Sequence, residues 1–140
     1  MEDQLISLET AKLAKEKGFI IPTLFFYVMN NNAWLDYILV DELESQFGVI
    51  SESQDHNGNN WFIPRYSAPT QSLLQKWLRE VHELHATADC NASGWSWFLD
   101  KTSGTHINSG DYDGPNDGGR WDTFEEALEI SLQKALNRVK

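Results

Sequence analysis

The clearest periodic pattern in the chain lies between residues 69 and 85. When these residues are placed at 100° steps, the apolar side chains fall on one arc and the charged ones on the opposite side. The arc contains Leu73, Leu74, Trp77, Leu78, Val81, Leu84 and His85. The pattern predicts a helix from Pro69 and Thr70 to about His85, with Trp77 buried in the core and Arg79 on the solvated face.

Two more helices are predicted from the residues at their ends. A helix over residues 8–17 has Ser7 as a plausible N-cap, and Gly18 would end it in the left-handed conformation. Thr123 followed three residues later by Glu126 forms a capping box, which predicts the start of the last helix. The inner face of that helix would carry Phe124, Leu128, Leu132, Ala135, Leu136 and Val139.

Short apolar and aromatic runs between these helices indicate strands. The expected strands are residues 19–29, 34–40, 47–50 and 61–66. Asn57 and Gly58 form a hairpin-type dipeptide, and residues 95–101 and 105–108 flank a turn that predicts a second hairpin. This order of elements predicts an α+β fold in which about three helices pack on an antiparallel sheet.

Length and composition restrict the possible classes of protein. With 140 residues we expect a single domain over 1–140, and one cysteine, Cys90, excludes an internal disulfide framework. The net charge of −10 argues against direct nucleic-acid binding and against binding to anionic membranes. An acidic N-terminus and the lack of a membrane-length apolar run predict a cytoplasmic protein.

The acidic residues are unevenly distributed along the chain. Residues 1–60 hold ten acidic and three basic side chains, and no Lys or Arg lies between Lys17 and Arg65. The acidic residues of that interval are Asp36, Asp41, Glu42, Glu44, Glu52 and Asp55. If they share a face, they would attract a basic partner, such as the nucleic-acid channel of a host enzyme. A face that only keeps the protein in solution is the simpler interpretation.

His82, His85 and Cys90 are the first candidate metal ligands. Two histidines three residues apart on a helix can contact one metal ion, and a thiolate could add a third soft ligand. The zincin pattern instead needs histidines four residues apart. The spacing therefore favours core or helix-end histidines, and we predict neither a metal site nor a cofactor.

The loop 111–122 is the second candidate, because its carboxylates echo a calcium-binding loop. Asp111, Asp113, Asp117 and Asp122 occupy relative positions 1, 3, 7 and 12. An EF-hand needs glycine at position 6 and glutamate at position 12, where this chain has Asn116 and Asp122. A polar turn is favoured, and a cation-binding protein or metal-dependent hydrolase using this loop is the alternative.

Tryptophans next to polar loops suggest a third function class, a glycan-binding module. The residues concerned are Trp61, Trp95, Trp97 and Trp121. Trp95 and Trp97 are two positions apart on one predicted strand, so both should be buried or both presented. Core packing is the favoured interpretation, and stacking on sugar rings is the alternative.

Three segments together resemble a group of known sequences. They are SLETAKLAKEKGF at 7–19, PTQSLLQKWLRE at 69–80 and TFEEAL at 123–128. The arrangement resembles small proteins encoded in phages and prophages of Bacteroidetes-type bacteria. The resemblance covers less than a third of the chain. The resemblance implies a phage or prophage origin, and it supplies no catalytic residue.

The chain also lacks the common catalytic motifs: it has no nucleophile elbow, no P-loop and no dinucleotide-binding glycine motif. Enzymatic activity stays open, but a non-enzymatic role is favoured. We therefore predict a phage-type binding protein that occupies a basic surface of a bacterial host protein through its acidic face. An anti-defence inhibitor, of the anti-CRISPR kind, is the most concrete version of this prediction.

Overall fold

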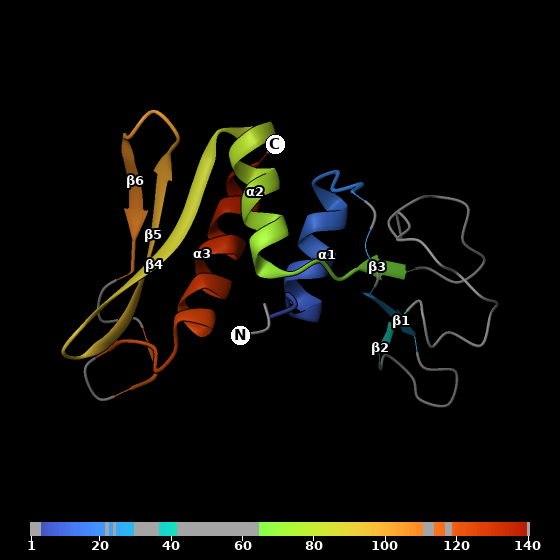
Figure 1. Cartoon of the computed structure of the whole chain (residues 1–140), viewed down its shortest axis with the longest axis horizontal. Helices are drawn as coiled ribbons and strands as arrows, with labels where there is room; N and C mark the ends of the chain where they lie inside the picture. The colour runs from blue at the N-terminus through green and yellow to red at the C-terminus, as the bar shows by residue number, and fades with distance from the viewer. Residues whose placement is uncertain are drawn as a thin grey trace. The chain divides into compact units, whose positions relative to one another are not determined.

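The computed structural model describes residues 4–21, 23, 25–29, 37–41, 65–110, 114–116 and 119–139. The chain divides into an N-terminal unit, Leu5–Thr70, and a C-terminal unit formed by Gln71–Lys140 together with Met1–Gln4. The α+β class is confirmed, with three helices and antiparallel strands in the described residues (Figure 1). The strands form two three-stranded sheets, one in each unit, rather than the single sheet expected. The single domain over 1–140 stays a prediction.

Helix α1 (Leu8–Glu16) opens the N-terminal unit and has the predicted ends. The Ser7 side chain accepts a hydrogen bond from the Thr10 N–H at 3.3 Å, which confirms the N-cap. Gly18 has φ +90°, and the following Phe19 N–H donates to the Ala14 carbonyl at 3.0 Å. This bond closes the helix in a Schellman-type cap, with Phe19 fully buried behind it.

The sheet of the N-terminal unit has the order β2-β1-β3. Its strands are β1 (Phe25–Met29), β2 (Tyr37–Asp41) and β3 (Arg65–Ser67), and both neighbours run antiparallel to β1. Strand β1 is shorter than the predicted 19–29 because Phe19 belongs to the cap of α1 and Ile20 is 65% exposed. The predicted strand 47–50 and the turn at Asn57 and Gly58 lie outside the described residues.

Helix α2 (Gln71–His82) belongs to the C-terminal unit and ends earlier than predicted. Leu74, Trp77 and Leu78 are buried, which confirms the core role of Trp77. The helix stops because Glu83 has φ +57°, a left-handed conformation in which the helix does not continue. Leu84 and His85 therefore lie in a strand, and their predicted place on the helix was wrong.

Val81 was also expected to be buried, but it is 58% exposed. It has the same angular position on α2 as the buried residues, and it lies in the last turn of the helix. An angular arc fixes the direction of a side chain and not its position along the helix axis. The elements that cover Leu74 and Leu78 therefore leave Val81 uncovered.

The sheet of the C-terminal unit has the order β4-β5-β6. Strand β4 (Leu84–Asn91) pairs antiparallel with β5 (Gly94–Lys101), which pairs with β6 (His106–Ser109) and confirms the predicted second hairpin. Strand β4 was not predicted, since its first residues had been assigned to the helix. The Gln75 side chain of α2 donates to the Ala86 carbonyl of this strand at 2.6 Å.

Helix α3 (Phe124–Arg138) packs on β4 and β5, and α2 packs against α3 and β4 on the same side of the sheet (Figure 1). The Thr123 side chain accepts from the Glu126 N–H at 3.1 Å, which confirms the predicted N-cap. The Ser131 hydroxyl donates to the Phe98 carbonyl at 2.6 Å and ties the helix to β5. The buried residues of its inner face are Ala127, Leu128, Ser131, Leu132, Ala135 and Leu136. No helix of the described residues is long and apolar enough to cross a membrane.

Candidate functional site

The structure places only one of the six predicted partner-binding residues. Asp41 is the last residue of β2 and pairs with Phe25 at the start of β1. The other predicted residues lie outside the described residues; they are Asp36, Glu42, Glu44, Glu52 and Asp55. A shared acidic face therefore stays a prediction.

The candidate ligands His82, His85 and Cys90 come from different places in the C-terminal unit. His82 ends α2, His85 lies near the start of β4, and Cys90 is exposed near the end of that strand. The His82 ring packs edge-on against Trp77, with 4.6 Å between the ring centroids. Among the described residues no three His, Cys, Asp or Glu side chains are arranged to hold a metal ion.

The described part of the loop 111–122 is organised by Asn116. Its Oδ1 accepts from the Arg120 N–H at 2.7 Å, and its Nδ2 donates to the Ser93 carbonyl at 3.0 Å and to Asp122 Oδ1 at 3.2 Å. A Cβ at Gly114 would clash with the Arg120 main chain, so glycine is needed for this turn. These contacts are those of a polar turn, whereas Asp111, Asp113 and Asp117 lie outside the described residues.

The described tryptophans of the C-terminal unit pack in its interior. Trp77, Trp97 and Trp121 are buried, and Trp95 is half-buried with its ring edge-on to Phe124 at 5.4 Å. Trp95 and Trp97 share the sheet face that α3 covers, as their spacing predicted. These indoles leave little surface for a sugar ring, and Trp61 lies outside the described residues.

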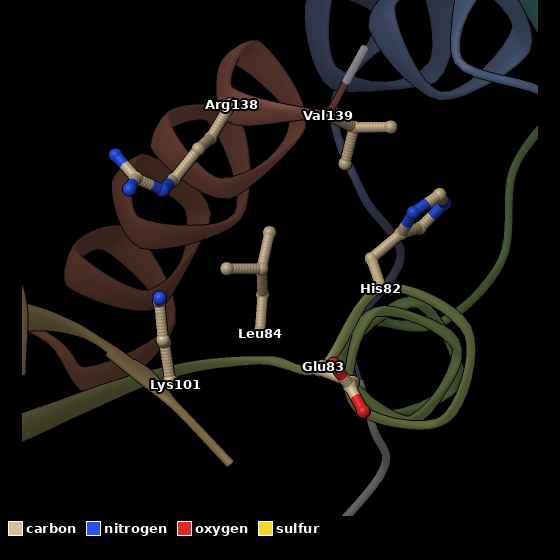
Figure 2. Close-up of a pocket in the computed structure, with 6 residues that line it drawn as sticks. All are labelled: His82, Glu83, Leu84, Lys101, Arg138 and Val139. Atoms are coloured by element: carbon tan, nitrogen blue, oxygen red, sulfur yellow. The ribbon is translucent and has the colours of Figure 1, made fainter. Parts of the chain in front are cut away.

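A pocket that sequence reasoning missed lies where three elements of the C-terminal unit end. Its volume is about 290 Å³. It is lined by His82, Glu83, Leu84, Lys101, Arg138 and Val139, which come from the α2–β4 junction, the end of β5 and the end of α3 (Figure 2). The three stretches that supply them, 82–84, 101 and 138–139, are far apart in sequence and form no motif. The left-handed junction, the strand register and the packing of α3 on the sheet bring them together.

Backbone contacts fix the walls of this pocket. The Glu83 carbonyl accepts from the Thr102 N–H at 3.1 Å, and Leu84 pairs with Lys101 across the β4–β5 register. The Val139 N–H donates to the Leu136 carbonyl at 3.1 Å, which holds the residue after α3 against the helix end. Leu84 and Val139 are 6% and 5% exposed, so they form an apolar wall.

The charges at the pocket are mainly basic. Lys101 and Arg138 are exposed, and Figure 2 shows both side chains on the same side of Leu84, with the Lys101 amine directed toward the Arg138 side chain. Neither forms an ion pair with a carboxylate in the part of the chain that the structure describes. The Glu83 carboxylate is turned away from both (Figure 2). A second hollow of about 260 Å³ shares Arg138 and adds Lys134 to this basic area.

Polar contacts of His82 are incomplete. Its Nε2 is buried and has no hydrogen-bond partner among the described residues. Most buried polar groups in proteins do have such a partner. The His82 nitrogen is enclosed by protein, so the accessible part of the pocket combines two cationic groups with an aliphatic wall.

Comparisons with known proteins found no family model, no curated protein and no solved structure that matches this chain.

Proposed function

We propose that this protein is a non-enzymatic binding protein whose acidic segment, residues 36–55, docks on a basic surface of a bacterial host protein. The observation that carries the proposal is the charge distribution. No Lys or Arg lies between Lys17 and Arg65, while six acidic residues fall in that interval. Complementary charge accelerates association and selects the partner.

The connectivity of the N-terminal unit supports this role. The chain leaves β2 at Asp41, opposite Phe25, and returns at Arg65, opposite Val28. Strands β2 and β3 lie on either side of β1. Residues 42–64 are therefore attached at both ends to the same sheet, which reduces the entropy that the segment loses when a partner binds it.

The resemblance to small phage and prophage proteins supports the choice of partner. A phage protein that acts in a bacterial cytoplasm meets host defence enzymes, and the guide–target channel of an RNA-guided nuclease is strongly basic. Carboxylates can occupy the sites at which such a channel binds phosphate groups. An anti-defence inhibitor is therefore the most specific form of the proposal.

The test compares two variants of equal net charge. The segment variant carries Glu42→Lys, Glu44→Lys, Glu52→Lys and Asp55→Lys. The control variant carries Glu16→Lys, Glu80→Lys, Asp89→Lys and Glu126→Lys, all at exposed positions. Tagged wild-type protein is used to isolate partners from a bacterial lysate, and the purified partner is then titrated with all three proteins at two salt concentrations.

We expect the segment variant to bind at least tenfold more weakly than the control variant. The binding that it keeps should depend less on salt, because exposed charge pairs are screened by ions. A partner that binds the segment variant and the control variant equally would contradict the proposal. A guided-nuclease cleavage assay with the same three proteins then tests the anti-defence form.

A further inference from the structure

We propose that the pocket at the end of α3 binds a small carboxylate with a branched aliphatic portion. The carboxylate would lie between Lys101 and Arg138, and the aliphatic portion would contact Leu84 and Val139. All of these residues belong to the C-terminal unit. The site is therefore separate from the acidic segment, and this inference does not depend on the proposed function.

Two cationic side chains, Lys101 and Arg138, lie at the pocket. Lys101 and Arg138 come from different elements, yet they lie on the same side of Leu84, with the Lys101 amine directed toward the Arg138 side chain (Figure 2). Two like charges at one pocket repel each other, and neither has a carboxylate of the described residues as an ion-pair partner. An anion placed there removes the repulsion, and the planar arginine fork suits the two oxygens of a carboxylate.

Stabilisation of helix ends explains only part of this arrangement. Arg138 lies in the last turn of α3, where a cation interacts favourably with the helix dipole. Lys101 is the last residue of β5, and it lies at the same pocket as the ends of α2 and α3. The His82 ring packs edge-on against Trp77 on the other side of the pocket, so it leaves the two cationic groups as the polar part of the site.

A strained backbone conformation at Glu83 shapes the pocket. Glu83 has φ +57°, although it is not glycine, and it separates His82 from Leu84 on two walls of the pocket. Strained residues of this kind cluster at binding sites, where the surrounding structure holds them in place.

The size and the wall define the class of ligand. A volume of about 290 Å³ is at the small end of ligand pockets, which favours a small ligand. An inorganic anion would contact the cationic side only and leave the aliphatic wall unused. A carboxylate with about ten non-hydrogen atoms contacts both sides. A free branched-chain acid and the C-terminal leucine of a peptide share this chemistry.

The test is an NMR titration of the full chain with 4-methylpentanoate. We expect saturable shifts at the amides of Glu83, Leu84 and Lys101, with a Kd on the order of 1 mM, which is typical for so small a ligand. The uncharged 4-methylpentanamide and the short anion acetate should each bind at least tenfold more weakly. N-acetyl-leucine represents the C-terminal leucine of a peptide, and 4-methylpentanoate represents a free branched-chain acid. Whichever of the two compounds binds more tightly indicates which of these sources the pocket prefers.

Variants assign the binding to the pocket. Arg138→Gln and Lys101→Gln should each weaken 4-methylpentanoate binding at least fivefold, while Lys76→Gln and Arg79→Gln on the solvent face of α2 should leave it unchanged. Thermal melts show that each variant is folded. The proposal is overturned if the amide binds as tightly as the acid, if phosphate displaces the acid at equal concentration, or if Arg138→Gln and Lys101→Gln bind like the wild type.

Discussion

Helices α1 and α2 end in the same left-handed backbone conformation, but different residues adopt it. Gly18 follows α1 with φ +90°, and Glu83 follows α2 with φ +57°. Glycine adopts this conformation freely, whereas a residue with a Cβ loses about 1–2 kcal/mol. After Gly18 the chain closes its own helix through Phe19, while after Glu83 it enters β4 directly and the Glu83 carbonyl accepts from Thr102.

The difference shows where a protein tolerates backbone strain. The end of α1 depends on local hydrogen bonds, so a residue with low intrinsic cost is needed there. The end of α2 is held by buried side chains on one side, Leu74, Trp77 and Leu78, and by a paired strand on the other. A strained junction persists in such surroundings because the structure around it fixes the backbone.

Removing the packing of α2 should have the largest effect. Trp77 is 5% exposed, and Trp77→Ala should lower the free energy of unfolding by about 3–5 kcal/mol, since it leaves a large cavity. Urea unfolding followed by fluorescence measures the loss. If the variant keeps its stability but no longer binds a partner, then Trp77 belongs to an interface. The strained end of α2 would then not depend on the packing of Trp77.

The end of α1 should respond to a Cβ. Nothing lies within 4 Å of a Cβ built on Gly18, so Gly18→Ala tests conformation alone. We expect a loss of about 1 kcal/mol, and a smaller loss for Gly18→Asn, because asparagine tolerates the left-handed region better. Hydrogen exchange of the Phe19 amide should increase in the alanine variant. Equal stability of the wild type and the alanine variant would contradict this reading of the cap.

The end of α2 should respond in the opposite direction. Glu83→Gly removes the strain but increases the entropy of the unfolded chain, so a net gain of about 0.5 kcal/mol is expected. Glu83→Ala removes the same carboxylate while it keeps the Cβ, and it should bring no gain. Thermal melts of the two variants separate the effect of the lost carboxylate from the effect of the relieved backbone. If both variants are more stable than the wild type, the gain comes from the loss of charge.

The solvent face of α2 should contribute least. Arg79→Ala lies away from the buried face, and its stability should differ from that of the wild type by less than about 0.5 kcal/mol. The same urea experiment measures it. A loss as large as that expected for Trp77→Ala would mean that this face is covered.

Local signals explain which elements could be predicted from the sequence. Ser7, Gly18 and the pair of Thr123 and Glu126 act on backbone groups within a few residues, so their pattern was sufficient for the three helix ends concerned. Trp77 was predicted in the core from helical periodicity alone. These features need no knowledge of distant parts of the chain.

The parts that were missed depend on long-range contacts. Glu83 carries no intrinsic preference for a left-handed junction, and it is the Thr102 contact and the pairing of β4 with β5 that hold it there. Because the helix was predicted to continue past Glu83, His85 was assigned to the helix and β4 was not predicted. The pocket was missed for the same reason, because the register that brings Lys101 next to Leu84 has no local sequence signal.

The hydrogen bond between Gln75 and the Ala86 carbonyl has a consequence for self-association. Among the residues that the structure describes, strand β4 has one neighbour in its sheet, and its other side is an edge of the kind at which a foreign strand can add. The Gln75 amide occupies a main-chain acceptor of this edge strand. An incoming strand must break that bond before it can pair with Ala86, so we expect this side chain of α2 to disfavour strand addition at the edge.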